Sequence, residues 1–149
     1  MPTDIDPFIS FQFGLDIPDI SDAGYFTEVS GLEFKIPATK SLVVTKDGKR
    51  ILRQIPGDGV EYGDIVLKRG MTANMALWKW RVMVEEGKID EARKNGSIVM
   101  YNMAGVEIAR WSFTNGWPSK LTGPSLTSDS DDVAIEELTI VHEGLTRDL

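Results

Sequence analysis

The chain has 149 residues, of which 42% are apolar and 26% charged, a composition typical of one globular domain with a sizeable core. It has no cysteine, which excludes disulfides, thiolate metal sites and a cysteine nucleophile. Its formal net charge of -7 disfavours a general nucleic-acid-binding surface, because such a surface must neutralise phosphates. No apolar run approaches the roughly 20 residues that cross a bilayer, so direct membrane insertion is not expected.

Two strands are predicted near the start of the chain. Residues 8–17 place Phe11, Phe13 and Leu15 on one face, at the period of two that indicates a half-buried strand. Residues 25–36 form a second strand candidate that is interrupted by a Ser-Gly pair. We expect these two strands to form a hairpin.

A second hairpin is predicted at about residues 38–58. Two β-branched runs, residues 42–45 and 51–55, flank an Asp-Gly pair, which is a strong hairpin signal. Residues 39–53 contain five basic residues and one Asp, for a net charge of +4. This hairpin has too few apolar residues to bury both faces, and a two-stranded hairpin alone is marginal in water. We therefore expect it to lie either on its own domain or on a partner.

One main helix is predicted at about residues 73–86, after a short strand at residues 65–69. Thr72 can cap its start and Gly87 its end. Its apolar residues recur at helical spacing, at Ala73, Ala76, Leu77, Trp80 and Val84.

The four tryptophans are expected to differ in burial. Trp78 and Trp80 lie roughly opposite each other on the helix, so one should face the core and the other an interface or an overlying loop. Trp111 and Trp117 are expected to anchor the core.

The second half of the chain reads as strands. A short helical turn at about residues 90–94 is expected to end at Asn95-Gly96-Ser97, read as a turn. Residues 98–102 and 106–113 are predicted strands joined by a tight turn at residues 103–105, and the apolar phase shifts within the second strand.

A last strand is predicted at residues 133–143. Its apolar phase slips at Glu136 and Glu137, and a β-bulge there would restore a single buried face. The alternative is a strand buried on both sides except at one acidic patch. A chain that ends in a long strand leaves a sheet edge that must be paired, covered or blunted.

These elements predict a mainly β fold for residues 1–149, taken as a single domain. Strands dominate and no βαβ alternation is present. We expect two packed antiparallel β-sheets that form a sandwich or barrel, with the helix at about residues 73–86 covering an edge or an open end.

No set of residues predicts catalysis or cofactor binding. His142 is the only histidine, which argues against a Ser-His-Asp set or a metal site and favours a structural role. Residues 128–132 are acidic but lack the glycine and the terminal glutamate of an EF-hand loop. We therefore expect no enzyme activity, no cofactor and no metal.

Motifs spread along nearly the whole chain carry a resemblance. They are residues 11–15 (FQFGL), 26–32 (FTEVSGL), 67–70 (LKRG), 77–80 (LWKW), 111–118 (WSFTNGWP), 120–124 (KLTGP), 133–138 (VAIEEL) and 142–145 (HEGL). In their order and spacing the chain resembles the tail tube protein family of contractile phages and of phage-tail-like contractile injection systems.

The resemblance implies a structural subunit of an inner tube. Family members form hexameric rings that stack into a hollow tube, which a contractile sheath surrounds and which delivers effector cargo or DNA. The implied partners are further copies of the chain, the sheath protein, baseplate and tube-cap proteins, and lumenal cargo. The implied location is assembly in the bacterial cytoplasm, within a phage tail or a phage-tail-like particle.

Two alternatives remain open at this point. One is a ring or carrier protein of the type VI secretion class, which shares the architecture. The other, from a different functional class, is a small monomeric β-barrel domain that binds a ligand. Such a domain would need a concave pocket with convergent polar groups.

Charge distribution predicts which residues contact neighbouring copies. Heterologous ring contacts require two different matching patches, and the basic hairpin and the acidic ends of the chain are candidates for one such match. The predicted inter-subunit contact residues are Lys46, Lys49, Arg50, Arg53, Glu136 and Glu137.

Overall fold

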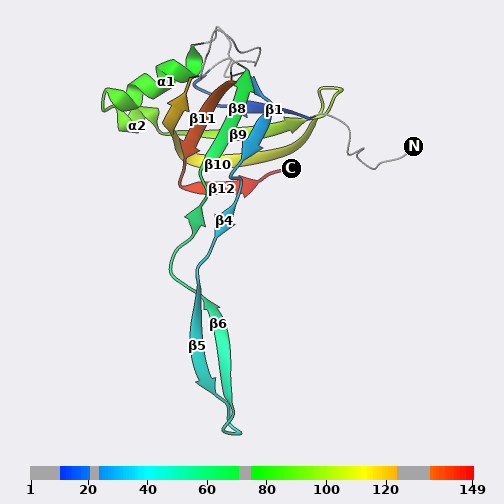
Figure 1. Ribbon diagram of the computed structural model, residues 1–149, viewed down its shortest axis with the longest axis vertical. Coiled ribbons are helices and arrows are strands. Elements are labelled where there is room, and N and C mark those ends of the chain that lie inside the picture. The colour runs from blue at the N-terminus through cyan, green and yellow to red at the C-terminus, as the bar shows by residue number, and fades with distance from the viewer. Residues whose placement is uncertain (1–10, 21–23, 71–74, 124–134) are drawn as a thin grey trace, which may run out of the picture.

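Two crossing layers of antiparallel strands make up the body of the molecule. The computed structural model describes residues 11–20, 24–70, 75–123 and 135–149. The strands of the body are β1 (Gln12–Asp16), β2 (Tyr25–Phe26), β3 (Glu28–Ser30), β8 (Ile65–Gly70), β9 (Lys94–Tyr101), β10 (Glu107–Thr122), β11 (Ile135–Val141) and β12 (Gly144–Arg147). They pair in the order β2-β1-β9-β10-β11-β8-β3, with β12 paired to β10. In Figure 1, β8 and β11 run steeply while β9, β10 and β12 cross behind them.

Strand β10 belongs to both layers. Its first part pairs with β9 and β12, and from Trp117 onward it pairs with β11. Register shifts interrupt it between Phe113 and Gly116 and between Pro118 and Lys120, and Asn115 has a positive φ of 51°. Such irregularities let one strand turn from one sheet into the next. The predicted mainly β fold of packed antiparallel sheets is confirmed as a sandwich.

The core lies between the two layers. Its largest fully buried side chains include Trp80, Phe26 and Phe113, together with aliphatic side chains from both layers. Those aliphatic side chains are Ile65, Leu67, Ile98, Leu138 and Ile140.

One of the two helix tryptophans faces the core, as predicted, but the two strand tryptophans differ from the prediction. Trp80 is the core tryptophan, and its Nε1 donates to the carbonyl oxygen of Ala92 at 2.7 Å. Trp111 and Trp117 are only partly buried, so the prediction that they anchor the core is wrong. The Arg147 guanidinium lies 5.6 Å from the Trp111 ring centroid, where it covers the ring from outside.

Two short helices cover one end of the sandwich (Figure 1). They are α1 (Ala76–Glu85) and α2 (Ile89–Ala92). Leu77 and Trp80 of α1 are buried, as the apolar spacing predicts. Gly87 follows α1 with a positive φ of 80°, which suits a glycine at a helix end. Thr72, the predicted cap, lies outside the described residues.

Strand β11 keeps one phase throughout, so neither prediction for it is correct. Glu136, Leu138 and Ile140 alternate as buried residues, and the pairing with β8 is regular across Glu136 and Glu137. There is no bulge at these two residues, and the register shift lies in the partner strand between Pro118 and Lys120. The apparent slip arises because a buried glutamate occupies a core-facing position.

The ends of several predicted strands also differ. Asn95-Gly96-Ser97 lies inside β9 and is not a turn. A Cβ on Gly96 would come within 2.8 Å of both Ile17 and Phe113, so this glycine allows close packing inside a strand. The strand predicted last, β11, is an interior strand, because it pairs with β10 on one side and β8 on the other. A further strand, β12, follows it and pairs with β10.

The first predicted hairpin is confirmed but is shorter than expected. Phe13 pairs with Phe26, and Gly14 with Tyr25. After Thr27, whose N–H donates to the Lys68 carbonyl oxygen at 2.8 Å, the chain leaves β1 and joins β8 as β3. The second predicted strand is thus three short strands. The first, β2, pairs with β1, the second, β3, pairs with β8, and the third belongs to the arm described next.

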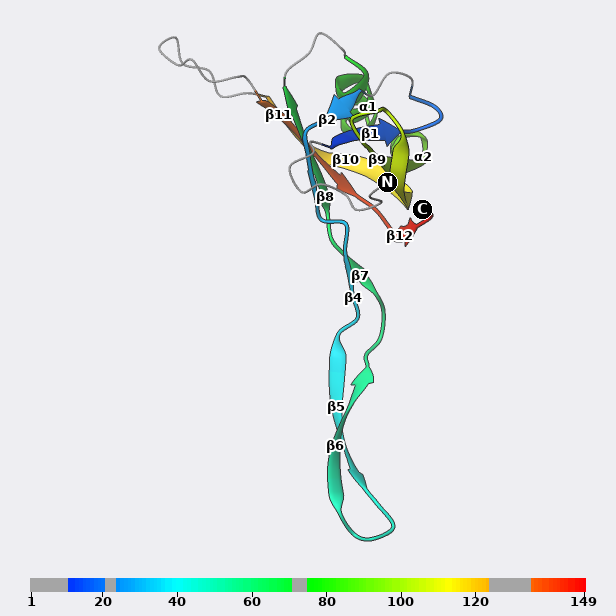
Figure 2. The same ribbon diagram turned by 90° about the vertical axis from the view of Figure 1, so that its right-hand side faces the viewer.

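A long two-stranded arm leaves the body and extends far beyond it (Figures 1 and 2). Near the body it consists of β4 (Phe34–Lys35) paired with β7 (Glu61–Tyr62), and further out of β5 (Ala38–Val44) paired with β6 (Arg50–Pro56). The predicted hairpin is confirmed, with Gly48 at a positive φ of 80° in its turn. We refer to residues 33–63 as the arm.

Replacing Gly31 with Ala should destabilise the body by about 3 kcal/mol, because two costs add. Gly31 has a positive φ of 83°, and a Cβ there would lie 1.8 Å from the backbone oxygen of Asp64. Gly48→Ala is the matched control, since φ is also positive there but no atom lies within 4 Å of an added Cβ. Urea unfolding of the two variants should show a much larger loss of stability for Gly31→Ala, and equal losses would contradict the close approach of Gly31 to the Asp64 backbone.

Candidate assembly surfaces

The arm exposes apolar side chains that a single chain does not cover. Every residue of β6 is exposed, as is every residue of β5 except Ser41. The large exposed apolar side chains of the arm are Phe34, Ile36, Leu42, Val43, Val44, Ile51, Leu52, Ile55 and Val60. Large contiguous apolar surfaces are unusual on monomers and indicate interaction sites.

Both faces of the outer arm carry part of this surface. In the register of the hairpin, Leu42 faces Leu52 and Val43 faces Ile51. Neighbouring pairs point to opposite faces of a two-stranded ribbon. Leu42 and Leu52 on one face are each 60% exposed, and Val43 and Ile51 on the other are 39% and 43% exposed, so neither face of the ribbon has its own core.

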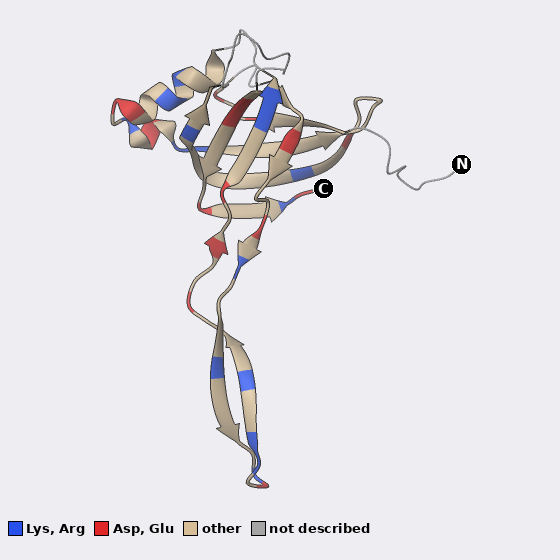
Figure 3. Ribbon diagram, viewed as in Figure 1, with Lys and Arg blue, Asp and Glu red and all other residues tan. Residues whose placement is uncertain are grey.

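The four predicted basic contact residues all lie on the outer arm and are exposed. Lys46 and Lys49 lie at the turn, and Arg50 and Arg53 lie on β6 (Figure 3). Among the described residues no ion pair within the chain involves any of the four, whereas the body pairs most of its arginines with carboxylates. These cations are therefore available to a second molecule.

The two predicted acidic contact residues are separated by the sheet. Glu136 is 5% exposed and points into the core. Its Oε2 accepts from Arg69 Nε at 3.1 Å, and its Oε1 accepts from Trp78 Nε1 at 3.0 Å. The Arg69 guanidinium also lies 5.0 Å from the Phe26 ring centroid. This buried group ties α1 to β8 and β11 inside one chain.

Glu137 lies on the opposite, outward face of the same layer. It pairs in register with Lys68, which in turn forms an ion pair with Glu28 at 3.7 Å. Glu137 is thus placed where a neighbouring molecule could reach it, unlike Glu136. The sequence pattern predicted the same role for both glutamates because it does not show which face of β11 each one occupies.

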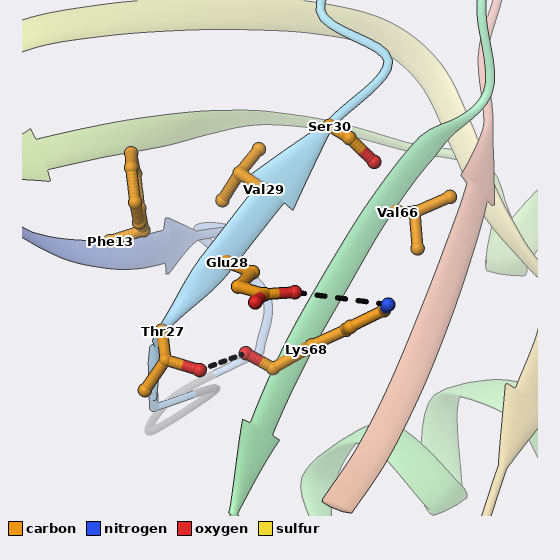
Figure 4. A pocket seen from close by; sticks show the side chains of 7 residues that line it. All are labelled: Phe13, Thr27, Glu28, Val29, Ser30, Val66 and Lys68. Carbon is orange, nitrogen blue, oxygen red and sulfur yellow. Dashed lines mark hydrogen bonds and ion pairs between the residues drawn. The ribbon is translucent and has the colours of Figure 1, made fainter.

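An open pocket of about 350 Å³ lies along the edge strand β3 (Figure 4). Thr27 Oγ1 donates to the Lys68 carbonyl oxygen at its rim. The lining residues are Phe13, Thr27, Glu28, Val29, Ser30, Val66 and Lys68. It is an open groove beside the edge strand β3, and its two charged side chains, Glu28 and Lys68, pair with each other at 3.7 Å. This differs from an enclosed ligand site, whose polar groups converge on the ligand.

A charged network covers the outer face of the other layer. Arg110 Nε donates to Glu107 Oε1 at 2.6 Å, and Arg110 Nη1 donates to Asp16 Oδ2 at 3.2 Å. The hydrogen bond from Arg110 lowers the pKa of Glu107, and the same bond raises the pKa of Arg110. Burial, followed by the charges of Tyr25 and Glu107, raises the pKa of the Tyr101 phenol. Near neutral pH Glu107 is therefore ionised, Arg110 is protonated and the Tyr101 phenol is uncharged, so these three groups form a fixed surface pattern and not a proton-transfer site.

His142 lies where the arm joins the body. It is 8% exposed, and its ring contacts Tyr62 of the arm at a centroid distance of 5.4 Å and Phe113 of the body at 6.3 Å. Both ring nitrogens lie near carbonyl oxygens. Nδ1 is 3.0 Å from the oxygen of Gly144, and Nε2 is 3.0 Å from that of Gly63.

Within the described ranges, no group of three or more His, Asp or Glu side chains is placed to hold a metal ion. In that same part of the chain, no helix is long and apolar enough to cross a membrane.

Comparison with known proteins identifies the family. A family model described as T4-like virus tail tube protein gp19 matches residues 9–146. The chain belongs to this tail tube family. No curated protein sequence matches the chain.

Solved structures of tube proteins share the fold of this tail tube family member. A chain of the sheath–tube complex of an extracellular contractile injection system, PVC, in the extended state is 22% identical, with a TM-score of 0.70 over 95% of this chain and 89% of that one. A chain of the anti-feeding prophage baseplate is 18% identical, with a TM-score of 0.67 over 99% of this chain and 97% of that one. Hcp1 from Flavobacterium johnsoniae is 14% identical, with a TM-score of 0.54 over 95% of both chains.

Proposed function

We propose that this chain is the repeating subunit of the inner tube of a contractile phage tail or phage-tail-like injection particle. Hexameric rings of the chain would stack into a hollow tube. The observation that carries the proposal is the arm, which is exposed on both faces and projects from a body of the tail tube family. An element of this kind gains stability only when a second molecule covers it.

The arm would reach onto a neighbouring copy of the chain. Its unpaired cations Lys46, Lys49, Arg50 and Arg53 would face acidic groups there, and the chain as a whole has the required excess of acid, with a net charge of -7. Glu137 is the better acidic candidate of the two predicted, since Glu136 is occupied by Arg69 and Trp78. Residues 1–149 would act as one structural unit, with the arm as its extension.

The proposed partners follow from the kinds of complex in which similar chains are found. Those complexes contain a sheath, a tube terminator, a baseplate and a tube-terminating cap. We expect corresponding partners here, with effector cargo or DNA in the lumen and assembly in the bacterial cytoplasm. The chain would act mechanically, without catalysis and without a cofactor.

A ring or carrier protein of the type VI secretion class is the second candidate. The likeness in fold to Hcp1 supports it, at a lower TM-score than the likeness to the injection-system chains. A small monomeric ligand-binding domain is disfavoured by the open shape of the groove beside β3.

Negative-stain electron microscopy of the purified chain at increasing concentration tests the proposal. We expect six-fold rings that stack end to end into tubes. Rings that never stack, and that co-purify with a bound effector, would favour the carrier. A homogeneous monomer by light scattering at all concentrations would rule out both.

A further inference from the structure

We propose that His142 is a proton-controlled clamp that fixes the arm to the body, so that the arm is held more rigidly at mildly acidic pH than at mildly alkaline pH. The clamp is a property of the isolated chain. Its consequence for assembly rests on the proposed function.

The position of His142 allows it to act on the arm. Its Nε2 lies 3.0 Å from the carbonyl oxygen of Gly63, a residue 79 positions away in the sequence, at the root of the arm. The N–H of Gly63 donates across the root to the carbonyl oxygen of Glu33 at 3.1 Å. A bond to the Gly63 carbonyl therefore holds the point where the two strands of the arm meet the body.

The two contacts of the imidazole cannot both be made by its neutral form. A neutral imidazole has one N–H and one lone pair, whereas an imidazolium has two N–H donors. Both nitrogens of His142 face carbonyl oxygens, which only accept. In the neutral ring, one nitrogen lone pair would face an oxygen lone pair at 3.0 Å. Protonation turns that contact into a second, charge-assisted bond.

Two aromatic side chains of the described residues contact the ring, and one of them, a tyrosine, is titratable. Tyr62 of β7 lies against the ring, and from β10 the contact is the apolar Phe113. Aromatic faces stabilise a cation, while burial opposes it. Histidine side chains ordinarily exchange this proton between about pH 5 and 8.

Three carboxylates lie near His142 in the sequence or at the arm root, namely Glu143, Asp64 and Glu33. Glu143, the next residue, accepts from Asn115 Nδ2 at 2.8 Å. Asp64 is exposed, and the Glu33 side chain packs beside Gly63 at the arm root. A pH effect on the arm must therefore be separated from titration of Glu143, the nearest of these in the chain.

The protonated ring should hold the arm root more tightly than the neutral ring, because only the protonated ring can donate to both carbonyl oxygens. With a second proton on the ring, His142 gains a donor and can bond both carbonyl oxygens, so the arm root is held more tightly. Without that proton one of the two bonds is lost, and the root loosens when the remaining proton is on Nδ1, because Nε2 then faces the Gly63 carbonyl oxygen with a lone pair. The amide of Gly63 should then exchange with solvent about tenfold faster relative to an unstructured peptide, the factor expected for losing one hydrogen bond to a charged group.

The test uses the single histidine as a probe. Labelling with 15N-histidine marks a single imidazole in the unassembled chain, and the chemical shifts of its two nitrogens report which of them carries a proton, or whether both do. Hydrogen exchange at Gly63 is measured in the same samples between about pH 5 and 8. We expect both nitrogens to become protonated as the pH falls, and the protection of Gly63 to rise with them.

Two variants distinguish the clamp from a structural role. His142→Gln can donate to Gly63 but cannot titrate, so it should fold and show a protection of Gly63 that does not change with pH. Glu143→Gln, the matched control on the adjacent residue, should keep the wild-type profile. An imidazole that stays neutral throughout would overturn the clamp, as would protonation without any change at Gly63 or an unchanged profile in His142→Gln. Failure of the chain to form tubes would instead count against the proposed function alone.

Discussion

Replacing residues 38–58 with a short Gly/Ser linker should leave the body folded and abolish tube formation. The outer arm contributes little to the core, because all of β6 and nearly all of β5 are exposed. Its removal should therefore change the free energy of unfolding of the body by no more than about 0.5 kcal/mol. Assembly should fail because the surface that spans two molecules is gone. Circular dichroism and urea unfolding report the first effect, and electron microscopy reports the second.

Two gentler variants separate the apolar from the charged contribution of the arm. Leu42→Ser with Leu52→Ser removes an exposed cross-strand pair without changing charge. Neutralising the four cations, Lys46, Lys49, Arg50 and Arg53, to Gln removes the charge and leaves the apolar side chains. We expect the first variant to abolish assembly and the second to slow it, since charge complementarity acts mainly on the rate of association. Normal tubes from the linker variant would show that the arm is not an assembly element.

Glu136→Ala should destabilise the body by about 3–5 kcal/mol, because it removes a buried carboxylate that accepts hydrogen bonds from both Arg69 and Trp78. The Arg69 and Glu136 side chains are only 3% and 6% exposed, so solvent cannot replace the lost bond. The Trp78 indole N–H loses its acceptor at the same time. The loss should appear as a lower midpoint in urea unfolding, with the slope of the transition unchanged.

Glu137→Ala is the matched control, since it removes the same side chain one residue further along β11. Glu137 is not part of the buried group and lies on the outer face, so its loss should cost about 0.5 kcal/mol or less. Replacing the buried pair with Arg69→Met and Glu136→Leu should recover part of the stability lost in Glu136→Ala. Equal effects at the two glutamates would contradict the orientation of β11.

The arm was predictable because its signals are local. An Asp-Gly turn between β-branched runs defines the hairpin. Its projection away from the body did not follow from the sequence, which left open a position on its own domain or on a partner. Its extension by the β4–β7 pair was not predictable, because strands of two residues carry too little pattern. The close approach of Gly31 to the Asp64 backbone, where the arm leaves the body, was not predictable either, because no sequence pattern marks a contact between such distant residues.

The buried acid was misread because strand phase depends on the partner strands. Glu136 pairs with Arg69, Leu138 with Leu67 and Ile140 with Ile65, all facing the core. A signal was present in the sequence: each strand has a charge in phase with its apolar residues, and the two charges are opposite. Reading one strand at a time hides such a pair, and the same limitation led to the wrong assignment of Trp111 and Trp117, which lie on either side of the irregularity in β10.

The way the arm enters the body determines how tension would pass between molecules. Its two strands continue into β3 and β8, which are hydrogen-bonded neighbours, and β8 runs roughly along the direction of the arm (Figure 1). Ladder hydrogen bonds lie perpendicular to the strands. A pull at the tip would therefore load the β8–β11 ladder in shear, with the bonds from Ile65 to Gly70 resisting together. The buried bond between Arg69 and Glu136 crosses that same ladder, so the body is reinforced at the strand through which a moving tube would be pulled.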